Sequence, residues 1–130
     1  MPSARLLTVY QVIAIHDSLI EATGGAHGLR DLNLLEAAIG RPHAGIRDDE
    51  FFPSIFDKAA ALLHALITAH PFVDGNKRAG MVVAIYVLES HGWWLDTPQA
   101  ELEDFAVFVA LQKPEVSEIA EWLQAHSTSL

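Results

Sequence analysis

Apolar side chains recur every three to four residues along most of the chain, which is the spacing of one face of an α-helix. The first such pattern covers residues 9–22. Thr8 and Gln11 have the spacing of a capping box at its start, and the glycine pair at 24–25 ends it. A shorter pattern over 32–39 predicts a second helix, so the first third of the chain is expected to be helical.

The next pattern, residues 55–69, is apolar on nearly all sides, which is typical of a helix in the middle of a bundle. Ser54 is its expected N-cap, and Pro71 prevents its continuation. A polar loop is expected at 48–50, and only 93–95 has a strand-like composition. The remaining helices are expected over 79–90, 98–112 and 117–126. The prediction is an all-α fold with about six helices.

Composition limits the classes of protein. Of 130 residues, 51% are hydrophobic, which suffices for one core and predicts a single domain over 1–130. The longest apolar runs are far below the roughly 20 residues of a membrane helix, and no signal-peptide pattern begins the chain, so a cytoplasmic location without membrane contact is expected. The net charge of −9 argues against direct nucleic-acid binding, which needs clustered cations. With no cysteine, disulfides and thiolate metal sites are excluded.

Polar residues with chemical potential gather in HPFVDGNKRAG, residues 70–80. Gly75 gives the backbone freedom, and the amides that begin the following helix can bind an anion together with Lys77 and Arg78. This combination favours a polyphosphate. Asp74 fits such a site if Mg²⁺ joins its carboxylate to phosphate oxygens.

His70 carries an imidazole, which can take a proton from an attacking hydroxyl. Phe72, an apolar residue within this polar motif, is expected to anchor the loop to the core. Taken singly, these residues also fit a helix cap, a turn and a solvated charge pair, and only their combination favours a functional site. A zinc site from His64 and His70 is disfavoured, because a spacing of six places them on different helix faces. The other histidines have no partner pattern and are expected to be structural or on the surface: His16, His27, His43, His91 and His126.

Residues 70–78 match the pattern H-x-F-x-D-x-N-K-R, which is the loop of the Doc (death-on-curing) toxins in the Fic (Fido) superfamily. The upstream segments GGAHGLRD at 24–31 and LEAAIGRP at 35–42 resemble Doc-type sequences in the same order. The chain therefore resembles the Doc family over nearly its whole length.

This resemblance implies an α-helical Fido fold and the transfer of a phosphate-containing group from a nucleotide to a protein hydroxyl. It also implies a role for each residue of the loop. His70 matches the catalytic base, Asp74 the acid that organises Mg²⁺, Asn76 and Arg78 the phosphate-binding residues, and Gly75 the backbone anion hole.

Lys77 stands where adenylyl-transferring Fic proteins have glycine, and Met81 replaces their second arginine. A bulky cation there should crowd the α-phosphate of a nucleotide. The resemblance to Doc, which shares the lysine, implies that ATP binds in the reverse orientation and that its γ-phosphate passes to a threonine of elongation factor Tu, which stops translation. Nucleotidyl transfer stays open as an alternative, as does a non-catalytic co-repressor that binds an antitoxin.

Fic proteins that restrain themselves carry an (S/T)-x-x-x-E-(G/N) segment. The nearest stretches here, 97–101 and 117–121, continue with Leu102 and Trp122 instead. The resemblance therefore implies restraint by a Phd-like antitoxin, whose disordered tail folds as a helix in a groove on the toxin. Four apolar residues are candidates to line the groove, although core packing is the commoner role for such side chains: Phe51, Phe52, Trp93 and Trp94.

Overall fold

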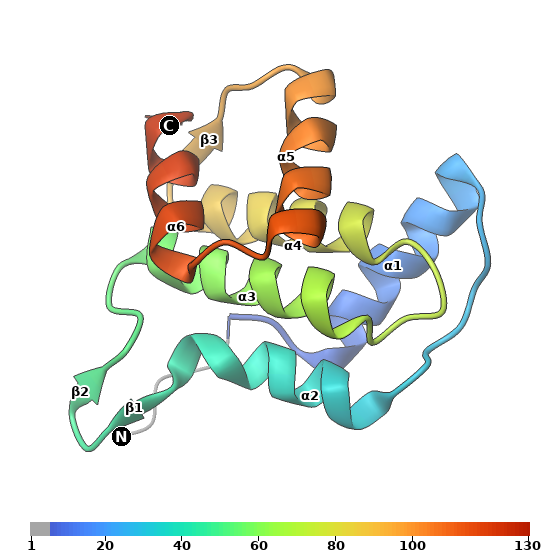
Figure 1. Ribbon diagram of the computed structural model, residues 1–130, viewed down its shortest axis with the longest axis horizontal. Coiled ribbons are helices and arrows are strands. Elements are labelled where there is room, and N and C mark those ends of the chain that lie inside the picture. The colour runs from blue at the N-terminus through green and yellow to red at the C-terminus, as the bar shows by residue number, and fades with distance from the viewer. Residues whose placement is uncertain (1–5) are drawn as a thin grey trace.

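The computed structural model describes residues 6–130, and most of this length is helical (Figure 1). The helices are α1 (Val9–Thr23), α2 (Leu32–Gly40), the 3₁₀ turn η1 (Arg41–His43), α3 (Ile55–Ala69), α4 (Asn76–Ser90), α5 (Gln99–Gln112) and α6 (Val116–Ala125). The strands are β1 (Gly45–Ile46), β2 (Asp49–Glu50), β3 (Trp93–Leu95) and β4 (Ser127–Ser129). The predicted all-α fold with about six helices is confirmed.

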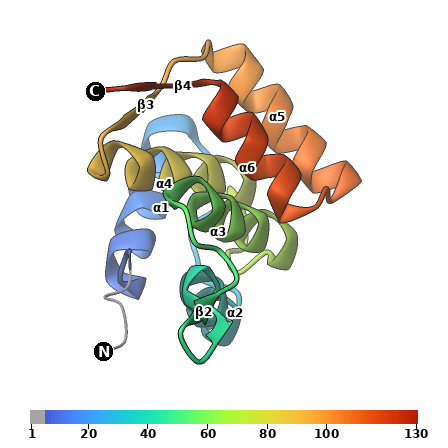
Figure 2. The same cartoon turned by 90° about the vertical axis from the view of Figure 1, so that its left-hand side faces the viewer.

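Helix α3 forms the centre of the bundle. It packs against α4 along its length, against α2 on one side and against α5 and α6 on the other (Figures 1 and 2). Its side chains are buried on nearly all sides, as its sequence predicted. Helix α1 packs against α4, so the loop that joins α3 to α4 lies where three helices meet.

The N-caps predicted at Thr8 and Ser54 are present. Thr8 and Gln11 form a reciprocal capping box at the start of α1, with hydrogen bonds of 3.1 and 2.8 Å. Ser54 caps α3, and the carboxylate of Asp57 completes a second capping box. The carboxylate of Asp31 accepts a hydrogen bond from the first turn of α2. These local bonds satisfy backbone donors that a helix start would otherwise leave without partners.

The structure moves several predicted helix ends by one residue and makes three further corrections. Helix α4 begins at Asn76 rather than at residue 79, so the cations of the loop lie in its first turn. Pro98 is the N-cap of α5 rather than its first helical residue. Residues 48–50, predicted as a loop, belong to a small antiparallel hairpin of β1 and β2, with Arg47 at a φ of 58° in its turn. The predicted strand at 93–95 pairs with β4.

Within residues 6–130, no helix is both long enough and apolar enough to cross a lipid bilayer.

Candidate functional site

His70 ends α3 in the left-handed conformation, with a φ of 53°. This turn is held by the guanidinium of Arg30, which donates hydrogen bonds to the carbonyl oxygens of His70 (2.6 Å) and Ala69 (2.8 Å). These carbonyls have no partner inside the helix, so a cation there is favourable for the helix dipole as well. The backbone of His70 is therefore fixed while its imidazole stays exposed.

Phe72 and Asn76 tie the loop to the core. The ring of Phe72 is only 2% exposed. Asn76, also buried, accepts a hydrogen bond at Oδ1 from the backbone N–H of Phe72 and donates from Nδ2 to the carbonyl of Phe72, each at 3.0 Å. Its Nδ2 also lies 3.5 Å from Nδ1 of His70. One side chain thus holds the loop closed and reaches the imidazole.

The carboxylate of Asp74 is held by two backbone amides. Oδ2 accepts from the N–H of Ala26 at 3.1 Å, and Oδ1 accepts from the N–H of Gly75 at 2.8 Å. These two hydrogen bonds, helped by the nearby charge of Arg78, lower the pKa of Asp74 below its ordinary value of 3.8. Asp74 is therefore ionised at neutral pH. The amide of Gly75, which the sequence suggested as an anion donor, is engaged by this carboxylate.

The glycine-rich segment after α1 runs alongside the loop. The N–H of Val73 donates to the carbonyl of Gly28 at 3.0 Å, and Leu29 forms an antiparallel bridge with Phe72. A side-chain carbon added at Gly25 would lie 2.6 Å from Oδ2 of Asp74, so a residue without a side chain is required there. The upstream motif GGAHGLRD thus has a structural role as a support for the loop.

Lys77 and Arg78 occupy the first turn of α4. The first backbone bond of this helix joins the N–H of Ala79 to the carbonyl of Gly75, and no side chain within the described residues caps it. The amides at 76–78 are thus available to an anion. The Lys77 side chain is exposed, whereas the guanidinium of Arg78 donates hydrogen bonds to the Thr23 hydroxyl and the Gly24 carbonyl.

The loop residues surround a cavity of about 300 Å³. Its walls carry an imidazole, a carboxylate and two cations, and are formed by His70, Val73, Asp74, Gly75, Asn76, Lys77 and Arg78. The structure therefore brings together the polar site residues that the sequence proposed. His64 does not join them, because its Nδ1 accepts a hydrogen bond from Arg41 at 2.6 Å.

A divalent cation fits this site only if a ligand supplies further oxygens. The described residues contain no cluster of three His, Cys, Asp or Glu side chains that could hold a metal. Each carboxylate oxygen of Asp74 accepts one backbone hydrogen bond and keeps a second lone pair. One ionised carboxylate is what Mg²⁺ commonly takes from a protein when phosphates supply its other ligands.

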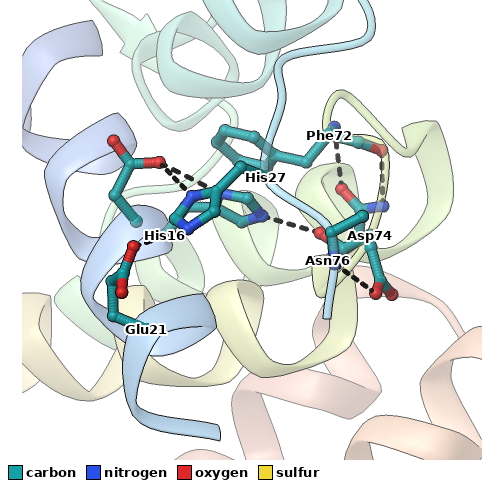
Figure 3. Close-up of polar contacts among 8 residues, drawn as sticks. His16, Glu21, His27, Phe72, Asp74 and Asn76 are labelled. Carbon is teal, nitrogen blue, oxygen red and sulfur yellow. Dashed lines mark hydrogen bonds and ion pairs between the residues drawn. The ribbon is translucent and has the colours of Figure 1, made fainter. Parts of the chain in front are cut away.

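His16, for which the sequence predicted a structural or surface role, is buried behind the loop. Its ring is 1% exposed, lies flat against Phe72, and contacts the backbone of Asp74 (Figure 3). A signal was present in the sequence: Val12, His16 and Ile20 are spaced by four on one face of α1, and all three are buried.

An apolar groove of about 420 Å³ adjoins the cavity and lies between α1, α4 and α5. It shares Lys77 and Arg78 with the cavity, and Leu19, Met81 and Leu102 supply apolar walls. The aromatic residues proposed for such a groove do not line it. Trp93 packs on Phe56, and Phe52 lies near the guanidinium of Arg41, whereas Phe51 and Trp94 are exposed elsewhere.

Comparisons with known proteins agree with this arrangement. A family model described as the Fic/DOC family matches residues 6–88. Toxin Doc of Mycolicibacterium smegmatis is 39% identical over 101 residues, which cover 76% of this chain and 78% of that protein. The protein kinase doc of Escherichia phage P1 is 34% identical over 121 residues, which cover 92% of this chain and 94% of that one. A Fido domain-containing protein of Dictyostelium discoideum is 50% identical over 40 residues, or 31% of this chain and 28% of its own length.

Proposed function

From the premise that this chain belongs to the Fic/DOC family, we propose that it is a Doc-type toxin that transfers the γ-phosphate of ATP to a threonine hydroxyl of elongation factor Tu. The observation that carries the proposal is the shared cavity of His70, Asp74 and Lys77, where a base, an ionised carboxylate and a cation face one space. The relative named protein kinase doc covers nearly the whole chain and supports phosphoryl rather than nucleotidyl transfer.

The reaction requires one proton acceptor and one site for phosphate charge. The imidazole of His70 accepts the proton of the threonine hydroxyl while its oxygen attacks the γ-phosphorus. The bond from that phosphorus to the β-bridging oxygen breaks, and ADP leaves. Arg30 holds the backbone of His70, so the base keeps its position during attack.

Three features at the start of α4 can bind the phosphates. Lys77 and Arg78 supply full charges, and the free amides at the start of α4 supply donors. Asp74 would hold Mg²⁺, which neutralises phosphate charge when it is bound. The side chain of Lys77 occupies space that glycine would leave open, and we expect it to exclude the orientation needed for nucleotidyl transfer.

The proposed partner is a Phd-like antitoxin. A groove between three helices, with apolar walls and cations at one end, suits an amphipathic helix with an acidic residue near Lys77 and Arg78. An occupant of this groove would contact the same two cations as ATP. Because the groove and the cavity share Lys77 and Arg78, we expect the antitoxin to inhibit the toxin by competing with ATP for these two cations.

One assay with two labels tests the activity. The purified chain is incubated with elongation factor Tu, Mg²⁺ and ATP labelled at either the γ or the α phosphorus. Label on the factor from the γ position only is the expected result. Label from the α position would replace the proposal with nucleotidyl transfer, and label from neither would favour a non-catalytic co-repressor.

A further inference from the structure

We propose that His16 is a positioning residue of this site, which fixes the peptide between Asp74 and Gly75 and thereby sets the direction of the Asp74 carboxylate. The proposal rests on the proposed function, because it assigns His16 to the same phosphate chemistry. It adds a residue from α1, distant in sequence, to a site whose cavity is lined by the loop between α3 and α4 and by the first turn of α4.

The first observation is a short buried hydrogen bond. Nε2 of His16 lies 2.7 Å from the carbonyl oxygen of Asp74. A carbonyl oxygen only accepts, so Nε2 carries the proton and donates it. Nδ1 lies 3.8 Å from the Asp17 carboxylate, which is too long for a hydrogen bond. The contact with Asp74 therefore sets the tautomer of this ring.

The second observation is a stacked contact. The rings of His16 and Phe72 are parallel within 4°, with centroids 3.8 Å apart (Figure 3). His16 thus holds the loop at two points, the anchor ring and the carbonyl two residues later.

The peptide between Asp74 and Gly75 is therefore held at both ends. Its carbonyl accepts from His16, and its N–H donates to Oδ1 of Asp74 at 2.8 Å. Without the imidazole donor this peptide can turn, and the N–H would leave the carboxylate. The carboxylate would then keep only the hydrogen bond from Ala26 and lose its fixed direction.

Two variants separate the donor from the stacked ring. His16→Phe keeps an aromatic face against Phe72 and removes the donor. His16→Gln removes the ring and places an N–H near the position of Nε2. His126→Phe is the matched control, because His126 also combines a bond from Nδ1 to a backbone carbonyl with stacking on Trp122, but at the end of α6.

Two readouts are measured for each variant beside the melting temperature. The first is the NMR signal of the Gly75 amide, which needs neither ATP nor metal. The second is the Mg²⁺ concentration that half-saturates ATP binding. We expect His16→Phe to move the amide signal and to raise the Mg²⁺ requirement by about 10- to 100-fold, as for other residues that orient a metal ligand. His16→Gln should recover most of both effects.

The result that overturns the proposal is a His16→Phe protein with the Gly75 signal and the Mg²⁺ requirement of the parent, whatever its melting temperature. Equal effects in His16→Gln and His16→Phe would also overturn it, since the donor would then be irrelevant. If the parent transfers no phosphate, the proposed function fails by itself. The Gly75 signal still decides the role of His16 in that case.

Discussion

Asn76 binds the backbone of Phe72 at both polar atoms, with Oδ1 accepting from its N–H and Nδ2 donating to its carbonyl, each at 3.0 Å. These two hydrogen bonds close the five residues 72–76 into a ring, and α4 begins at the last of them. The remaining Nδ2 hydrogen is directed at Nδ1 of His70, 3.5 Å away. Asn76 therefore stabilises the loop directly, while the phosphate-binding role implied by family resemblance stays a prediction.

Removing this amide should destabilise the whole protein. Asn76→Ala leaves two backbone groups of Phe72 without partners in a buried place, and each such group costs about 1–3 kcal/mol. Urea unfolding followed by circular dichroism measures the loss. Lys77→Ala, in the same turn but exposed, should stay within about 0.5 kcal/mol of the parent. Equal stabilities for the two variants would contradict the structural role of Asn76.

His70→Ala should abolish transfer while leaving the fold intact. The imidazole is exposed, so little packing is lost, whereas general-base catalysis contributes roughly 10²- to 10⁴-fold. The rate of label transfer to elongation factor Tu measures the effect, and growth arrest on expression should disappear with it. His91→Ala changes another exposed histidine, at the end of α4, and should leave both unchanged. Growth arrest that survives His70→Ala would show that the protein acts without proton abstraction.

Much of the fold could be predicted because the signals are local. Ser54 and Pro71 bracket α3 with a cap and a stop that act within one turn. The start of α4 could not be predicted, because it depends on Gly75 adopting a φ of 76° and on Asn76 folding back over the loop. The hairpin at 45–50 was missed since its strands have two residues each and no alternating pattern.

The candidate site, like the fold, could be predicted only where its residues are close together in the sequence. Its loop residues are contiguous, so their shared cavity follows from one motif. The contributions of Ala26 and His16 could not be predicted, because they lie 48 and 58 residues from Asp74 and a single sequence carries no record of which distant residues meet. Periodicity indicates that His16 faces the core, but not what it contacts.

The stability of the protein should fall on acidification in a way that depends on His64. Burial and the neighbouring Arg41 lower the pKa of His64 below its ordinary value of 6.5. As pH falls below 6.5, His64 binds a proton in the unfolded chain but stays neutral in the folded chain. The free energy of unfolding therefore decreases until the pH reaches the pKa of His64 in the folded state. Well above 6.5 this group contributes no slope, because it is neutral in both states.

Replacing the titrating ring tests this sign. His64→Asn keeps an acceptor near the position of Nδ1 for the Arg41 guanidinium and cannot bind a proton in this range. Denaturant unfolding between pH 5 and pH 7, a range set by the ordinary value of 6.5, should show a smaller pH slope in the variant, by no more than one proton per molecule. An unchanged slope would mean that another group is responsible.

The segment after α1 provides a paired test of how closely the Asp74 carboxylate must be held. Gly24 and Gly25 both have a positive φ, of 86° and 113°, so alanine at either position adds backbone strain of about 1–3 kcal/mol. At Gly25 the added side-chain carbon would lie 2.6 Å from Oδ2 of Asp74. At Gly24 the added carbon would have no other atom within 4 Å. Gly25→Ala should therefore displace the carboxylate, and Gly24→Ala should not.

The two variants should lose similar stability but differ in function. If Asp74 holds Mg²⁺ as proposed, we expect Gly25→Ala to raise the Mg²⁺ concentration that half-saturates ATP binding by about 10- to 100-fold, because the hydrogen bond from Ala26 that directs the Asp74 carboxylate is disturbed. Gly24→Ala should keep the parent value. Titrating Mg²⁺ in the presence of labelled ATP measures the Mg²⁺ requirement of each variant, and the melting temperature measures its stability. If the two alanines raise the Mg²⁺ requirement equally, backbone strain rather than the Asp74 contact is the cause, since only the strain is common to both positions.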